Sequence, residues 1–203
     1  MTVTVDDVRA ITGVTSDQIS DADITALINK AWEFLMLDLS VEVVRELTEL
    51  PTETDYIIKD AEGMIFDTNN DGSIDYNDVT IFYYDSDNIE HEITDTFTYY
   101  AEYNRLHFSS EPTDEQMYIR YREIRTYDND LVEQAHLWLS AYLVAGRVWG
   151  MAPRVVRVGR SGWEVRVPGE YFLNQYLQIA EGIRSGGRGV EYESRFTILD
   201  NSL

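Results

Sequence analysis

The chain has 203 residues, with 37 Asp or Glu against 16 Lys or Arg and a formal net charge of −21. This length suits one domain, or one domain with an inserted subdomain, and 44% hydrophobic residues provide a core. The lack of cysteine excludes disulfides, zinc–thiolate sites and cysteine nucleophiles. An acidic surface repels phosphates, which argues against nucleic acid as the main ligand. We expect no membrane span and no signal peptide.

Most basic residues are arginines rather than lysines, and most of them lie in the C-terminal part of the chain. Only Lys30 and Lys59 are lysines, and the other fourteen basic residues are arginines. Many carboxylates with almost no lysine are typical of salt-in halophiles. Molar salt shortens the Debye length to about 3 Å and screens the repulsion between surface carboxylates. The alternative interpretation is an ordinary acidic protein. Residues 1–119 hold 27 acidic and 5 basic residues, whereas residues 120–203 hold 10 and 11. We therefore expect the C-terminal part to face a different surface, such as the acidic part of a neighbouring copy.

Residues 1–51 have helical patterns. Thr4 is a candidate cap for a helix over 5–11 that ends at Gly13. Ser20 or Asp21 precedes a longer helix whose apolar residues recur at spacings of three and four: Ile24, Leu27, Ile28, Ala31, Phe34 and Leu35. The stretch 41–50 is a candidate third helix before Pro51.

Residues 52–127 are typical of antiparallel strands. Five stretches are rich in Tyr, Ile, Phe and Thr, namely 56–59, 79–84, 96–103, 106–109 and 116–126. Turns are expected at 104–105 and 111–114. None of these stretches has a helical period, so we expect a β-rich insertion.

Residues 128–185 return to helices. Asp128 or Asn129 caps a predicted helix that continues to about Gly150, and a final helix is predicted over 170–184. Between them, residues 154–167 are expected to form a hairpin that turns at Ser161 and Gly162. Residues 186–203 are an extended tail, with strand-like alternation over 190–199. The predicted fold class is α+β, a small helical core of N- and C-terminal helices with an inserted antiparallel β-rich subdomain.

One motif indicates a metal ion. Residues 67–78 fit the calcium-loop pattern D-x-N-x-D-G-x-I-x-x-x-D, with Gly72 at the sharp turn and Ile74 as the apolar anchor. The flanking residues predict strands, so we expect the loop at the tip of a β-hairpin and a structural Ca²⁺ or Mg²⁺. An Asn/Asp/Gly-rich turn that binds nothing is the alternative. The candidate ligands are Asp67, Asn69, Asp71, Ser73, Asp75 and Asp78.

The sequence gives little indication of catalysis. His91 lies between two glutamates that point to the opposite face of a strand, and His107 alternates with apolar residues. His136 lies beside the apolar face of a helix and is interpreted as structural or exposed. No G-x-S-x-G, P-loop, G-x-G-x-x-G or H-E-x-x-H motif is present. We therefore expect no enzyme activity.

The predicted hairpin has two interpretations. In the first it contacts the acidic surface of a neighbour, or DNA passing nearby, because Arg and Trp are enriched at interfaces. In the second its arginines are only solvated. The residues concerned are Arg154, Arg157, Arg160, Trp163 and Arg166.

The opening TVTVDDVRAITGVTSDQISDADITALINKAWEFL resembles the start of head–tail connector (adaptor) proteins of tailed viruses. These share a V-x-D-V-R helix start, a Thr-Gly break, an S-D-x-x-I-x-D run and a long helix of the I-x-x-L-I-x-x-A type. The later long helix, hairpin and second helix are similar to the family's plan of a helical core with a protruding arm. The resemblance covers about residues 1–45 and 128–185, and the β-rich insertion departs from it.

The resemblance implies a structural virion protein in the neck, assembled in the host cytoplasm. Such proteins form a dodecameric ring that extends the DNA channel between portal and tail, and the halophilic composition favours a haloarchaeal virus. Implied partners are the chain itself, the portal protein, a tail or head-completion protein, and DNA passing without sequence-specific binding. The family's C-terminal tail commonly reaches the portal, and the residues here with the alternation to add a strand to a partner are Tyr192, Phe196 and Ile198. The remaining classes are a calcium-dependent protein-binding module of a halophile and an enzyme.

Overall fold

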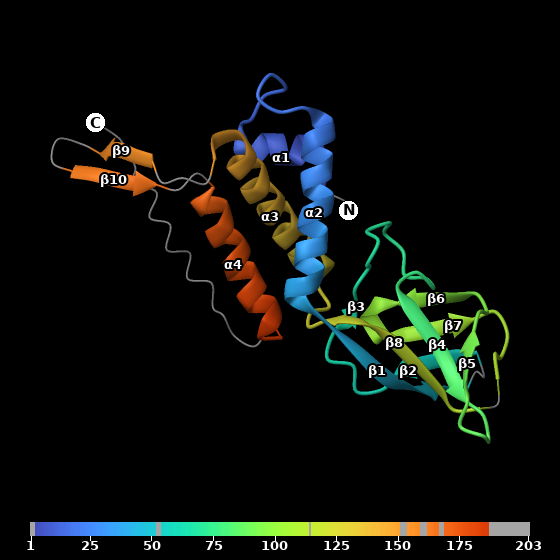
Figure 1. Ribbon diagram of the computed structural model, residues 1–203. Helices are drawn as coiled ribbons and strands as arrows, with labels where there is room; N and C mark the ends of the chain where they lie inside the picture. The colour runs from blue at the N-terminus through green and yellow to red at the C-terminus, as the bar shows by residue number, and fades with distance from the viewer. Residues whose placement is uncertain are drawn as a thin grey trace.

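Helices gather at one end of the molecule and a curled antiparallel sheet at the other (Figure 1). The computed structural model describes residues 3–51, 54–113, 115–150, 154–158, 162–166 and 169–186. The helices are α1 (Val5–Thr12), α2 (Asp21–Leu39), α3 (Asn129–Trp149) and α4 (Glu170–Arg184). Helix α3 packs on each of the other three. The predicted α+β class, with helices from both ends of the chain in one core, is therefore confirmed.

The helix ends follow from capping residues that the sequence predicted. The Thr4 hydroxyl accepts from the Asp7 amide while the Asp7 carboxylate accepts from the Thr4 amide, which makes a complete capping box. Gly13 ends α1 in the left-handed conformation, with φ of 71°. Ser20 caps α2 and Asp128 caps α3 through their side-chain oxygens. Thr4, Ser20 and Asp128 therefore define where α1, α2 and α3 begin, and Gly13 defines where α1 ends.

The main sheet contains eight strands. Seven are arranged in the order β5-β4-β8-β1-β2-β7-β6, and β3 pairs with β8 beside this path. A one-turn 3₁₀ helix (Ala101–Tyr103) follows β6. The strands are β1 (Ser40–Glu49), β2 (Asp55–Ile58), β3 (Met64–Ile65), β4 (Val79–Tyr84), β5 (Glu90–Ile93), β6 (Phe97–Tyr100), β7 (Arg105–Phe108) and β8 (Met117–Ile124).

The predicted third helix at 41–50 is wrong, because this stretch is strand β1. The backbone is already extended at Ser40, and residues 40–46 pair antiparallel with β8. Three valines at positions 41, 43 and 44 favour a strand, since β-branched side chains fit a pleated surface. The sheet therefore begins directly after α2, upstream of Pro51.

Side chains join β6 to the outer edge of β3. The Ile65 amide donates to the Tyr99 hydroxyl at 3.2 Å, and that hydroxyl donates to Asn104 Oδ1 at 2.6 Å. Asn104 is buried with φ of 47°, and its amide nitrogen donates to the Gly63 carbonyl. The predicted turn includes Asn104, but Arg105 already belongs to β7 and pairs with Tyr100. Asn104 and Tyr99 thus connect this end of the sheet to the outer edge of β3.

Strand β1 continues α2 without a loop, and two arginines hold this junction. Arg122 from β8 donates to the Ser40 hydroxyl and the Ser40 carbonyl, close to the C-terminal end of α2. A cation there interacts favourably with the helix dipole. Arg45 donates to Glu123, which is 1% exposed and also accepts from the Tyr121 hydroxyl and the Glu62 amide. Arg122 therefore links the end of α2 to β8, and the Arg45–Glu123 pair links β1 to β8 just beyond it.

Strands β9 (Arg154–Val158) and β10 (Gly162–Arg166) follow α3 and precede α4 in the chain and form a separate two-stranded sheet, which Figure 1 shows on the side of the helices away from the main sheet. The predicted hairpin is confirmed over these residues, and Gly162 begins β10. Its connecting residues 159–161 lie outside the described chain. Within the described ranges, no helix is long and apolar enough to cross a membrane.

Replacing Gly63 by alanine tests the packing of the sheet closure. A Cβ at this position would lie 1.8 Å from the Ile124 carbonyl oxygen, so the backbone must shift. We expect Gly63→Ala to lower the free energy of unfolding by about 3 kcal/mol. Gly13→Ala is the control, because a Cβ there meets only open space and costs about 1 kcal/mol of backbone strain. Equal denaturation midpoints for the two variants would contradict this close approach.

Candidate functional site

The calcium-type loop is an insertion between two chain segments that pair with consecutive residues of β8. Phe66 pairs with Arg122 of β8 through its amide at 2.8 Å, and Val79 follows opposite Tyr121. Residues 67–78 are therefore a twelve-residue excursion between neighbouring positions on the same edge of β8. The expected strands on both sides are present. The expected β-hairpin tip is wrong, because β3 and β4 both pair with β8 rather than with each other.

The loop's carboxylates are held by its own backbone. Asp67 accepts from the Gly72 amide at 2.8 Å, and Asp71 accepts from the Ser73 amide at 2.9 Å. Asp78 accepts from the Thr68 amide at 2.7 Å and from the Asp75 amide at 3.2 Å. These bonds fold the segment into a compact loop.

The loop does not form a ready-made carboxylate cage. No group of three or more His, Cys, Asp or Glu side chains positioned to hold a metal ion occurs among the residues that the structure describes. Burial, together with the charges of Asp78 and Asp71, raises the pKa of Asp67, while the Ser73 hydroxyl lowers the pKa of Asp71. The donor types and their order in sequence suit a hard cation, but binding requires the side chains to exchange backbone partners for the ion.

Contacts of Asp67 and Ile74 help to attach the loop to the rest of the molecule. The Trp32 indole of α2 donates to the Asp67 carbonyl at 2.9 Å, and the same ring stacks on Phe66 at 4.7 Å. Ile74 packs against the core of the sheet, as expected of the apolar anchor. The loop thus contacts both the helical part and the β-rich part.

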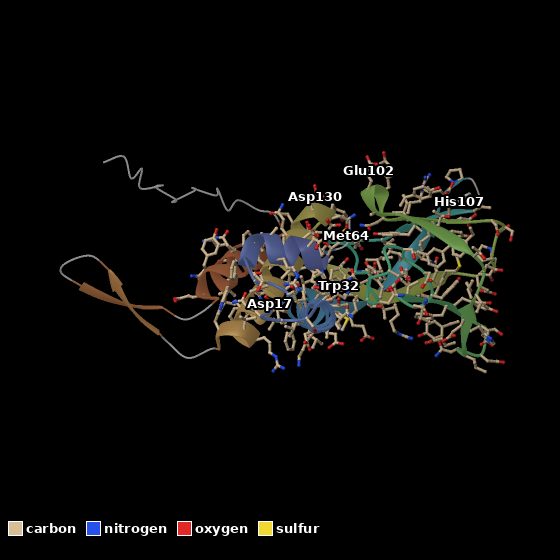
Figure 2. All side chains as sticks on the ribbon, turned by 90° about the horizontal axis from the view of Figure 1, so that it is seen from above. Asp17, Trp32, Met64, Glu102, His107 and Asp130 are labelled. Carbon is tan, nitrogen blue, oxygen red and sulfur yellow. The ribbon has the colours of Figure 1, made fainter. Side chains whose placement is uncertain are left out.

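A pocket of about 510 Å³ lies beside the loop, between the helices and the sheet. Its volume is in the range of small-ligand sites. Figure 2 shows Trp32 and Met64 near this junction. Helix α2 contributes Trp32, α3 contributes Val132, Glu133 and His136, the loop contributes Asn70 and Ser73, and β6 contributes Phe97 and Tyr99. The walls are mostly aromatic or apolar, and Asp67 and Glu133 are the acidic residues that line it.

His136 is a structural residue in this site. It is 1% exposed, and its Nε2 donates to the Ile28 carbonyl at 2.9 Å. Its ring also contacts Trp32 edge-on, with centroids 4.9 Å apart. Burial lowers the pKa of His136 from its ordinary value of 6.5. The pocket is therefore lined by a neutral imidazole at neutral pH.

The other histidines lie on the sheet, away from this pocket. His91 bonds to Asp85 at 2.7 Å and stacks on Tyr83, and His107 bonds to Asp55 at 3.1 Å. His107 lies on β7 between two buried residues, Leu106 and Phe108, and its own side chain is exposed, as the alternation in the sequence indicates. The three histidines do not form one constellation.

The predicted interface residues fall in three groups. Arg154, Arg157, Trp163 and Arg166 lie on β9 and β10, where register places Trp163 opposite Arg157 and Arg166 opposite Arg154. Arg160 lies between these strands, outside the described residues. The predicted tail residues also lie outside them, namely Tyr192, Phe196 and Ile198.

The pocket and its Trp32 contact are not predicted from the sequence. The helical period places Ala31 and Leu35 in the core, but nothing in it relates Trp32 to a carbonyl 35 residues away.

No protein-family model matches the chain, and no curated protein is similar to it.

The buried His136 predicts a pH-dependent stability. Its pKa is lowered in the folded chain, so the unfolded chain binds more protons as pH falls below 6.5 and unfolding is favoured. We expect the free energy of unfolding to fall between about pH 7 and pH 5.5, by at most about 1.4 kcal/mol per unit of pKa difference. Urea titrations at several pH values measure this change. In His136→Gln the free energy of unfolding should depend less steeply on pH than in wild type. Equal pH dependence of stability in wild type and His136→Gln would contradict this role of His136.

Proposed function

We propose that the chain is a structural connector of a tailed virus, a ring-forming protein between portal and tail. The observation that carries this proposal is the arginine-bearing hairpin β9–β10, which pairs with itself and lies outside the main sheet. An isolated two-stranded hairpin is marginally stable in water. A role in which the hairpin meets another surface accounts for its presence.

The charge of the hairpin supports an acidic partner. Residues 154–166 contain four arginines, at positions 154, 157, 160 and 166, and one acidic residue, Glu164. A carboxylate-rich surface complements this positive charge. Residues 1–119, with 27 acidic and 5 basic residues, supply such a surface on a second copy. Repeated contact of one copy's hairpin with the next copy's acidic part is heterologous and closes a ring when the rotation permits.

The helical core supports the same proposal through the opening segment. The Thr4 capping box, the Gly13 break and the long helix after Ser20 are all present, as the resemblance to connectors implies. An acidic wall also suits a channel, since DNA phosphates would not adhere to it. In this role DNA passes without sequence-specific binding, and the portal and a tail or head-completion protein bind the two ends of the ring.

Native mass tests the proposed assembly. We expect a ring-sized particle in molar KCl by light scattering, and we expect Arg154→Glu with Arg157→Glu to reduce it to the mass of one chain. The control is Arg147→Glu, a single charge reversal at an exposed residue of α3, which should leave the particle intact. A wild-type chain that stays monomeric across the concentrations measured would contradict a self-assembling ring.

The second candidate is a calcium-dependent protein-binding module, and the loop at 67–78 favours it. Six oxygen-bearing residues occur at the calcium-loop positions, with Gly72 in the left-handed region at φ of 86°. When bound, Ca²⁺ or Mg²⁺ would be held by Asp67, Asn69, Asp71, the Ser73 carbonyl, Asp75 and Asp78, and would neutralise their mutual repulsion. The ion's role would be structural, because the loop contacts both parts of the fold.

Calorimetric titration of the apo protein with Ca²⁺ and then with Mg²⁺ tests this loop. We expect Asp71→Asn to weaken binding by about tenfold or more, because it removes a central carboxylate ligand. Asp87→Asn is the matched control, an exposed aspartate in the β4–β5 turn outside the loop. Unchanged affinity in the Asp71 variant, or equal losses in both variants, would contradict a metal site here.

A further inference from the structure

Exposed apolar side chains are concentrated where α2 becomes β1. Phe34 is 43% exposed, Leu37 67%, and Val41 and Val44 53% each. Among the described residues, six exposed large hydrophobic side chains carry no hydroxyl, and these are four of them. In such an acidic chain, an apolar patch of this kind marks a contact surface. Val41 and Val44 are three positions apart on β1, so their side chains lie on opposite faces of the sheet. We call residues 34, 37, 41 and 44 together the junction patch.

The backbone beside the junction patch is an open strand edge. The Glu46 carbonyl accepts from the Lys59 amide and the Leu50 amide donates to the Asp55 carbonyl, so even-numbered residues of β1 face β2. Pairing with β2 begins only at Leu47. No strand of the described chain pairs with this edge at Glu42 and Val44. An extended segment with alternating apolar residues fits such an edge.

The end of α4 lies next to the same junction. Asp38, the neighbour of Leu37, accepts hydrogen bonds from the Tyr176 hydroxyl and the Arg184 guanidinium of α4. Figure 1 shows the C-terminal end of α4 near the start of β1. The described chain ends at Gly186, two residues beyond Arg184. The last seventeen residues, 187–203, therefore begin close to the junction patch.

The sequence of these last residues suits the open edge. Val190, Tyr192, Phe196 and Ile198 share one parity, as the apolar face of a strand requires. The three residues 187–189 span about 10 Å at the rise of an extended chain. We propose that residues 190–199 of the same chain add as a strand to the open edge of β1, where the apolar face of the added strand covers the part of the junction patch that lies on the same face of the sheet. The short tether favours the same chain over a second copy, because it sets a millimolar effective concentration.

This contact is intramolecular and does not depend on the connector role. Amide hydrogen exchange at Glu42 and Val44 in the full chain measures it directly. The test variant is Phe196→Asp, which places a charge on the proposed apolar face. The matched control is Thr197→Asp, the same change on the opposite face. Amides of β8 in each variant report whether the sheet remains folded.

We expect the Glu42 and Val44 amides to exchange faster by about tenfold or more in Phe196→Asp than in wild type. Thr197→Asp should keep the wild-type rates, and a chain ending at Gly186 should match Phe196→Asp. Equal exchange in wild type and in both Phe196→Asp and the shortened chain would overturn the proposal. Protection that falls on dilution would also overturn it, because the strand would then come from another copy.

Discussion

The junction of α2 and β1 is the constraint on which the rest of the structure depends. The backbone passes from the last helical turn into an extended strand at Ser40, with no loop to absorb a change of direction. Helix C-termini leave carbonyl groups without helical partners. Arg122 supplies a positive charge and hydrogen bonds to Ser40, and it comes from β8, the strand that pairs with β1. Pairing of these two strands therefore fixes both the end of the helix and the direction of the sheet.

A second link between the two parts passes through the loop at 67–78. Its ends are neighbours on the edge of β8, so the loop extends from the sheet without disturbing the pairing on either side. Trp32 then binds the first residue of the loop and packs against Phe66 and His136. Any change in the loop backbone at Asp67 acts on α2 through this indole. The pocket at this point is shaped by helix, loop and strand together.

Local signals predicted the helices well, and non-local contacts explain what the sequence missed. Thr4, Gly13, Ser20 and Asp128 act on their own neighbours, so their effects are visible in sequence order. Residues 41–50 have apolar residues at helical spacing, but they also have β-branched side chains that favour a strand. Pairing with β8, more than 70 residues away in the sequence, stabilises the strand instead of the helix.

The candidate site shows the same limit. The liganding pattern at 67–78 is local and was found, together with its flanking strands. The pairing of those strands with β8 is not local, and the expected hairpin tip was wrong for that reason. The pocket depends on side chains from Trp32 to His136, which only the folded chain brings together. The order of residues in the sequence does not show that these side chains lie next to one another in the folded chain.

The proposed strand on β1 and the proposed attachment to a partner protein both use the same tail residues, so the two contacts compete. Tyr192, Phe196 and Ile198 share one parity in the sequence, and an apolar face built from them cannot cover β1 and contact a partner at the same time. If the face is held on β1 in the free chain, a partner meets it only in the fraction of chains where the strand has detached. The apparent affinity for that partner is then reduced by this fraction. A neighbouring copy that covers the junction patch itself would release the tail and restore the affinity. Assembly of the chain with itself and attachment to a second protein would then be coupled through one short strand.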